Sequence, residues 1–182
     1  MNYLTCRLYG ICIRWYRLPN DYIDRIDECD IIIPLSYGLL QNGKLPDGTR
    51  QNIEQAVALG MKHPKTIIIT VNQNYLGNGA EEKERDKKQI LFSQLEPQSC
   101  VLFAQQACTN SVSEAQAAHA EAIRKGIKAK TIIVVCEPAH MRSARLLYRK
   151  IFTSSRVLLK GVPAQWEKNH ILPMCRSPFR WL

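Results

Sequence analysis

The feature that most constrains this sequence is a repeated alternation between short apolar runs and longer segments with helical spacing. The clearest run, Thr131–Cys136, consists of apolar and β-branched residues without apolar–polar alternation, which is typical of a strand buried on both faces. The segment from Met141 onward places apolar residues at helical intervals. The other predicted strands are Asp30–Leu35, Thr66–Val71, Cys100–Ala104 and Arg156–Leu159.

Segments of helix length separate all of these predicted strands. They are Thr49–Lys62, Ala80–Leu95, a segment from Asn110 to Gly126, and the segment from Met141. Thr49 is predicted to cap the first helix, and Ser111 and Glu114 are predicted to form a capping box at the third. Strands that alternate with helices form a parallel sheet covered on both faces. The sequence therefore predicts a three-layer α/β/α sandwich with about five mostly parallel strands.

The length of 182 residues fits one domain with a sizeable core. We expect this α/β domain over residues 28–160, after a peripheral helical segment at residues 1–27. An irregular tail, residues 161–182, is expected to pack on the domain. An alternative for residues 3–17 is an amphipathic helix that contacts a membrane surface, because aromatic residues and arginines share this stretch.

The formal net charge of +9 favours an anionic partner. A small anionic metabolite fits this charge. Nucleic acid is disfavoured because the basic residues are spread along the chain, and no stretch combines a basic stripe with aromatic residues that could stack on bases.

The cysteines indicate a reducing, cytoplasmic setting. There are seven, an odd number, and no two form a C-x-x-C pair. Cys100 and Cys136 stand in apolar runs, where a buried free thiol acts as a small hydrophobe. No apolar run is long enough to span a bilayer, and the sequence lacks the apolar core of a signal peptide.

Several motif classes are absent from the sequence. The glycine-rich dinucleotide fingerprint, the P-loop, G-x-S-x-G and H-E-x-x-H do not occur, which argues against a standard dinucleotide enzyme or P-loop ATPase. The four histidines have no metal-ligand spacing with cysteines or carboxylates, so no metal site is expected.

His140 lies in the predicted turn between the strand Thr131–Cys136 and the helix that follows. In open parallel sheets, ligands bind at this edge, outside the carboxyl ends of the strands. An imidazole titrates near neutrality, so His140 is a candidate general acid or base. The alternative role is a helix-start residue that is bonded to the backbone.

Arginines and a helix start suggest how an anionic ligand could be held. Arg50 is near the start of a helix, where the helix dipole disfavours a cation, and Arg142 follows His140 closely. The helix that begins at Asn110 and Ser111 would offer free backbone amides to an anion. Two glutamates, Glu114 and Glu84, are candidates to orient a hydroxyl or amine of the ligand.

Several of these pieces occur in one characteristic order. They are the apolar strand and small-residue loop Asp30–Gly38, Arg50, the acidic helix start Glu81–Glu84, Thr109-Asn110-Ser111-x-x-Glu114, and His140-Met141-x-x-Ala144. This series resembles the SanA/YdcF/ElyC-like family, also called domain of unknown function 218, over roughly residues 28–160. The resemblance implies a Rossmann-like fold and a nucleoside-type ligand such as S-adenosylmethionine. It implies a pocket formed by Ser36, Gly38, Arg50, Asn72, Asn110, Ser111, Glu114 and His140.

The sequence also departs from the family pattern. The glycine-rich first loop of the family is Pro34–Gly38 here, and the Ser-Gly-Gly after the second strand is Thr70–Asn72. Two hypotheses therefore stay open. In the first, the chain is a transferase or hydrolase with His140 and Glu114 as catalytic residues. In the second, it is a non-catalytic binding protein with an eroded family site. The sequence leaves the oligomeric state open.

Overall fold

The structure of this protein is a computed structural model that describes residues 29–63, 65–74 and 79–162. The expected N-terminal segment, including residues 3–17, lies outside the described residues, as does the tail from residue 163. No helix among the described residues is both long and apolar enough to cross a membrane.

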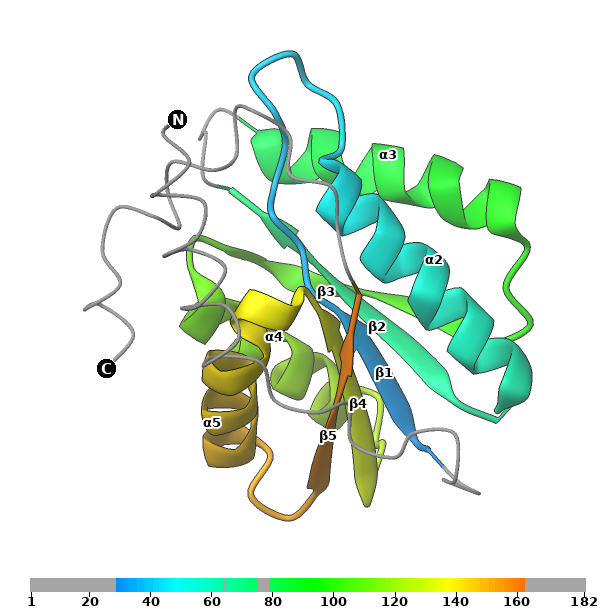
Figure 1. The fold of residues 1–182 in the computed structure, drawn as a ribbon, viewed down its shortest axis with the longest axis vertical. Helices are drawn as coiled ribbons and strands as arrows, with labels where there is room; N and C mark the ends of the chain where they lie inside the picture. The colour runs from blue at the N-terminus through cyan, green and yellow to red at the C-terminus, as the bar shows by residue number, and fades with distance from the viewer. Residues whose placement is uncertain (1–28, 64, 75–78, 163–182) are drawn as a thin grey trace, which may run out of the picture.

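Five parallel strands form a single sheet in the order β3-β2-β1-β4-β5, and helices cover both of its faces (Figure 1). The strands are β1 (Ile31–Pro34), β2 (Ile67–Gln73), β3 (Cys100–Cys108), β4 (Thr131–Cys136) and β5 (Arg156–Gly161). The helices are α2 (Asp47–Lys62), α3 (Ala80–Leu95), α4 (Ser111–Arg124) and α5 (Met141–Ile151), with a short 3-10 helix, Pro138–His140, before α5. The predicted α/β sandwich is confirmed, and its arrangement is Rossmann-like.

The isoleucines of β1 explain why this strand shows no apolar–polar alternation. Ile31 and Ile33 belong to the core beneath α4 and α5, whereas Ile32 belongs to the core beneath α2 and α3. All three side chains are fully buried. Burying such a side chain stabilises the fold by roughly 1.5–3 kcal/mol, so a strand that is apolar on both sides fits the middle of a covered sheet.

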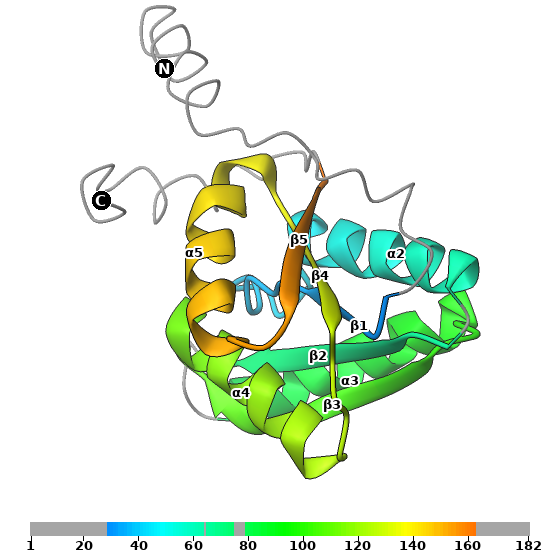
Figure 2. The same ribbon diagram turned by 90° about the horizontal axis from the view of Figure 1, so that it is seen from below.

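The sheet has a topological switch point between β1 and β4. From β1 the chain passes through α2 to β2 on one side, and from β4 it passes through α5 to β5 on the other side (Figure 2). Helices α2 and α3 share one face of the sheet, and α4 and α5 share the other. The connections therefore diverge at the carboxyl ends of β1 and β4, which is where ligands bind in open α/β sheets.

The residues predicted to cap two of the helices differ from those that the structure shows. Helix α2 begins at Asp47 after Pro46, and the Thr49 side chain lies inside the first turn, where it accepts a hydrogen bond from the Tyr37 backbone at 3.0 Å. At α4 the capping box is formed by Asn110 and Ser113. Because Ser113, and not Glu114, completes the capping box, the Glu114 side chain is not needed there and is buried in the protein.

The apolar residues Ile90, Leu91 and Leu95 predict an inward face of α3 that is correct only in part. Leu91 and Leu95 pack against the core, but Ile90 is 58% exposed. The buried residues of this helix are Ala80, Glu84, Lys88 and Phe92. These four are spaced at intervals of four residues, which is one face of a helix, but two of them are charged. Apolar periodicity cannot identify such a face. Cys100, expected in the core, is exposed, whereas Cys136 is buried as expected.

Candidate functional site

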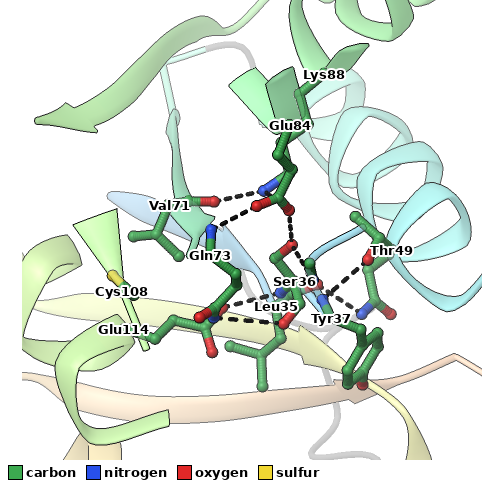
Figure 3. A network of polar contacts seen from close by, with 12 residues as sticks. Leu35, Ser36, Tyr37, Thr49, Val71, Gln73, Glu84, Lys88, Cys108 and Glu114 are labelled. Carbon is green, nitrogen blue, oxygen red and sulfur yellow. Dashed lines mark hydrogen bonds and ion pairs between the residues drawn. The ribbon is translucent and has the colours of Figure 1, made fainter. Parts of the chain in front are cut away.

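Ser36, the second residue after β1, connects helices from opposite faces of the sheet (Figure 3). Its backbone nitrogen donates to Glu114 Oε1 of α4 at 2.9 Å, and its hydroxyl donates to Glu84 Oε1 of α3. All three side chains are buried. The carboxyl end of β1 therefore holds two carboxyl groups in position, one from each helical layer.

Glu84 is held by three different donors. Lys88 approaches Glu84 Oε1 at 2.9 Å, and the backbone nitrogen of Gln73 donates to Glu84 Oε2. The Lys88 ammonium also donates to the Val71 carbonyl. Glu84 and Lys88 are fully buried, and a buried ion pair of this kind is tolerated only when hydrogen bonds satisfy its remaining atoms. Here the backbone of β2 supplies them.

A second group of side chains surrounds the Tyr37 hydroxyl. His140 Nδ1 lies 3.2 Å from the Tyr37 oxygen, and the Glu137 backbone nitrogen donates to the same oxygen at 3.3 Å. The two rings contact each other, with centroids 5.4 Å apart. Tyr37, which follows β1, thus connects to the residues that follow β4, across the switch point of the sheet.

Gly48, in the first turn of α2, allows Glu137 to approach closely. A Cβ atom at this position would lie 2.7 Å from Glu137 Oε1 and 3.0 Å from the Tyr37 ring. The Glu137 carboxyl group therefore lies against the amino-terminal turn of α2, whose backbone dipole favours negative charge. Ser36, Tyr37, Asn72, Gln73, Glu84, Lys88, Glu114, Glu137 and His140 are called the carboxyl-edge cluster below.

Burial changes the proton affinities of this cluster. Burial raises the pKa of Glu114 to about 7, an effect that the hydrogen bond from the Ser36 backbone partly offsets. Burial likewise raises the pKa of Glu137 to about 7. Burial lowers the pKa of His140 to about 4, so its imidazole is neutral at physiological pH. The groups that can both accept and release a proton near neutrality are therefore the two glutamates.

Four buried side-chain atoms of the carboxyl-edge cluster have no hydrogen-bond partner among the residues that the structure describes. They are Oδ1 and Nδ2 of Asn72, Gln73 Oε1 and Glu137 Oε2. A buried polar atom that stays unsatisfied costs about 1–3 kcal/mol, and native proteins hold few of them. The three oxygens can accept hydrogen bonds from the hydroxyl or amine groups of a small molecule, and Asn72 Nδ2 can donate one to a ligand oxygen.

The structure places the sequence-predicted site residues in two sets. Ser36, Asn72, Glu84, Glu114 and His140 belong to the carboxyl-edge cluster. Gly38 adjoins it, since the Gly38 backbone nitrogen donates to the Ser36 hydroxyl at 3.4 Å.

The remaining predicted residues have other surroundings. Arg50 is exposed and pairs with Asp47 at 2.8 Å and with Glu54 at 3.3 Å along its own helix. Asn110 is exposed and occupied in capping α4, next to Ser111. Arg142 is exposed in the first turn of α5. Among the described residues of the cluster, the one cationic side chain is Lys88, which Glu84 holds.

Four members of the carboxyl-edge cluster were not predicted from the sequence as site residues: Tyr37, Gln73, Lys88 and Glu137. Glu137 directly follows the last residue of β4, and Tyr37 follows β1 closely, so their positions at strand ends were the available signal. Lys88 stands four residues after Glu84, the spacing of an ion pair on one helix face. No sequence signal marked Gln73, whose role depends on the path of β2.

A shallow hollow on the outer side of α3, lined by Asp86, Gln89, Ile90, Ser93 and Gln94, is separate from this cluster. Its lining comes from one helix and brings together none of the groups described above.

No family model matches the chain, and comparisons with curated proteins and with solved structures give no significant match either.

Proposed function

We propose that this chain binds a nucleoside-type ligand at the carboxyl-edge cluster and acts on it as a transferase or hydrolase that uses carboxyl groups for proton transfer. The observation that carries the proposal is that Glu84 and Glu114 both bind Ser36 after β1, while Glu137 follows β4 on the other side of the switch point and keeps one buried oxygen without a partner among the described residues. Acceptor atoms of this kind recognise the hydroxyl and amine groups of a ligand.

The roles within the cluster follow from what already binds each group. Glu114 is occupied by the Ser36 backbone, and Glu84 by Lys88 and Gln73, so both are suited to hold the loop after β1 in place. Glu137 keeps one buried oxygen without a partner. With a pKa of about 7, Glu137 is the group best suited to take a proton from a ligand hydroxyl or a water molecule.

His140 takes a different role from the general acid that the sequence suggested. Its imidazole is neutral because burial lowers its pKa to about 4, and its Nδ1 faces the Tyr37 hydroxyl. A neutral imidazole bonded in this way can orient a ligand through hydrogen bonds. We propose that His140 and Tyr37 position the ligand beside Glu137.

The proposal also keeps the resemblance to the SanA/YdcF/ElyC-like family as its basis for the ligand class. A nucleoside such as S-adenosylmethionine presents ribose hydroxyls and amine groups, which suit a site rich in acceptors. A purely anionic metabolite suits it less well, because Arg50 is engaged with Asp47 and Glu54 on the surface. We also propose that the protein is cytoplasmic and that its own cysteines are in the reduced thiol form.

A thermal-shift screen of the full chain against nucleosides, S-adenosyl compounds and sugar phosphates tests the proposal. A ligand at about 100 times its dissociation constant stabilises a protein by about 2.7 kcal/mol. We expect a nucleoside-type compound to give such a shift, and we expect Glu137→Gln and Gly48→Ala to abolish it. Arg50→Gln is the matched control and should retain the shift, since its side chain lies on the exposed surface of α2.

The alternative is a non-catalytic binding protein. It is favoured by Val71 and Asn72, which stand at a strand end where the family has glycines. In that case a ligand would shift the melting temperature of both the unchanged protein and Glu137→Gln, and neither protein would turn the ligand over. Absence of a shift with every compound would contradict both forms of the proposal.

A further inference from the structure

Among the described residues, positive charge is gathered in the part of the chain that includes α4 and α5, on one face of the sheet. Residues 47–96, which include α2 and α3, contain seven basic and seven acidic residues. Residues 111–156, which include α4 and α5, contain nine basic and three acidic residues. The basic residues that looked evenly spread in the sequence are therefore concentrated by the fold.

Seven of these nine cations lie at one end of the molecule, where the chain enters β4 and β5. The loop after α4 and the loop after α5 meet there, since the Arg156 nitrogen donates to the Lys130 carbonyl at 2.7 Å and the Ser155 hydroxyl donates to the Ala129 carbonyl at 2.7 Å. All seven side chains are exposed. They are Arg124, Lys125, Lys128, Lys130, Arg149, Lys150 and Arg156, called the basic end below.

Among the residues that the structure describes, nearby acids and helix dipoles neutralise only part of this charge. Glu121 pairs with Arg124, and the Asp30 carboxylate accepts bonds from the Lys130 and Thr131 backbone at 2.7 and 2.8 Å. Helices α4 and α5 both end here, and each contributes about half a negative charge at its carboxyl end. Two carboxylates and about one charge from the dipoles do not balance seven cations.

Exposed aliphatic side chains accompany the basic end. Ile123, next to Arg124, is 64% exposed, and Leu146, one turn before Arg149, is 66% exposed. The aromatic side chains of α5 and the loop after it, Tyr148 and Phe152, are buried and cannot stack on nucleic acid bases. Cations mixed with exposed aliphatic residues are typical of a surface that binds anionic lipid headgroups.

We propose that the basic end docks the protein on an anionic phospholipid membrane surface. The docking site lies at the amino ends of the strands, whereas the carboxyl-edge cluster lies at the other ends of the same strands (Figure 1). A docked molecule would therefore hold its carboxyl-edge cluster away from the lipid. This inference does not depend on the proposed function, because the two sites share no residue.

Sedimentation of the full chain with phosphatidylcholine vesicles, with and without phosphatidylserine, tests the inference. We expect binding only to the vesicles that contain phosphatidylserine, with weaker binding at higher salt. The variant Lys125→Gln/Lys128→Gln/Lys150→Gln should bind about 100-fold more weakly, since each cation near such a surface contributes about fivefold. Ile123→Gln should weaken binding further when added to this variant.

The matched control is Lys44→Gln/Arg50→Gln/Lys83→Gln, which removes the same charge from exposed positions near the carboxyl ends of the strands, away from the basic end. It should retain most of the binding. Equal losses in both triple variants, binding that survives the first variant, or no binding to anionic vesicles would each overturn the inference. So would tighter binding to a single-stranded RNA oligonucleotide than to vesicles, if the same three lysines are required for it.

Discussion

The backbone nitrogen of Ser36 donates to Glu114 Oε1 at 2.9 Å, although the two residues are 78 positions apart. Glu114 belongs to the layer of α4 and α5, and the Ser36 hydroxyl binds Glu84 in the opposite layer. One residue at the end of the central strand thus receives contacts from both sides of the sheet. This arrangement explains why buried carboxyl groups are tolerated there.

Replacing Ser36 by alanine is expected to destabilise the protein by about 1–3 kcal/mol. The substitution leaves the backbone bond to Glu114 intact but removes the hydroxyl that donates to the buried Glu84 carboxylate. Chemical denaturation measures the loss. Ser93→Ala is the control, because the Ser93 hydroxyl bonds an exposed helix carbonyl and should change the stability by less than about 0.5 kcal/mol. Equal effects of the two substitutions would contradict this account.

Replacing Lys88 by methionine is expected to cost about 3–5 kcal/mol. The change leaves Glu84 buried without its counter-charge and removes a donor from the Val71 carbonyl. The double variant Glu84→Gln/Lys88→Met should be more stable than Lys88→Met alone, because the uncompensated charge is then absent. Denaturation of the four proteins of this cycle gives the coupling energy. A double variant no more stable than Lys88→Met would argue against a charged pair.

The stability of the protein should depend on the protonation of Glu114 and Glu137. The pKa of each is raised from its ordinary value of 4.5 to about 7, so the folded state binds protons more tightly than the unfolded state. Their contribution is fully present below about pH 4.5 and is lost as the pH rises through about 7. Each contributes up to about 3 kcal/mol to this fall. Denaturation at several pH values should show a smaller fall in Glu114→Gln and in Glu137→Gln.

His140 should act in the opposite direction. Its pKa is lowered from 6.5 to about 4, so its contribution to stability is present above about pH 6.5 and is lost as the pH falls through about 4. In His140→Gln, the stability should therefore fall less between pH 6.5 and pH 4 than it does in the unchanged protein. His63 on the end of α2 offers a control substitution, His63→Gln, for the general effect of removing a histidine.

Replacing Gly60 by alanine is expected to destabilise the protein by about 1–3 kcal/mol, even though alanine favours helices. A Cβ atom at this position of α2 would lie closer than 3.0 Å to the Ser99 hydroxyl. The Ser99 hydroxyl has no hydrogen-bond partner in the described part of the chain, so Ser99→Ala alone should cost little. The double variant Gly60→Ala/Ser99→Ala should recover part of the loss in thermal or chemical denaturation.

The apolar residues predicted the fold well because strands covered by helices on both faces bury apolar side chains on both faces. β4 coincides with the predicted strand Thr131–Cys136, and α3 with the predicted helix Ala80–Leu95. The orientation of α3 could not be predicted in the same way, since its inward face carries Glu84 and Lys88. A buried ion pair depends on partners distant in sequence, and the pattern of one helix does not reveal them.

The candidate site was predicted in part for a similar reason. His140 and Ser36 follow strands, and their place at the sheet edge follows from the parallel order. The direction of Arg50 depends on Asp47 and Glu54, which hold it on the outer side of α2. The charge of the basic end likewise depends on which loops meet, since Lys130 and Arg156 are brought together by the pairing of β4 and β5.

The contacts of Ser36 have a consequence for how the molecule opens. Because α3 and α4 bind the same residue through separate atoms, movement of either helix away from the sheet breaks a contact of Ser36. The two helical layers therefore belong to one cooperative unit at this end of the sheet, and their slowest amide protons should exchange with solvent together.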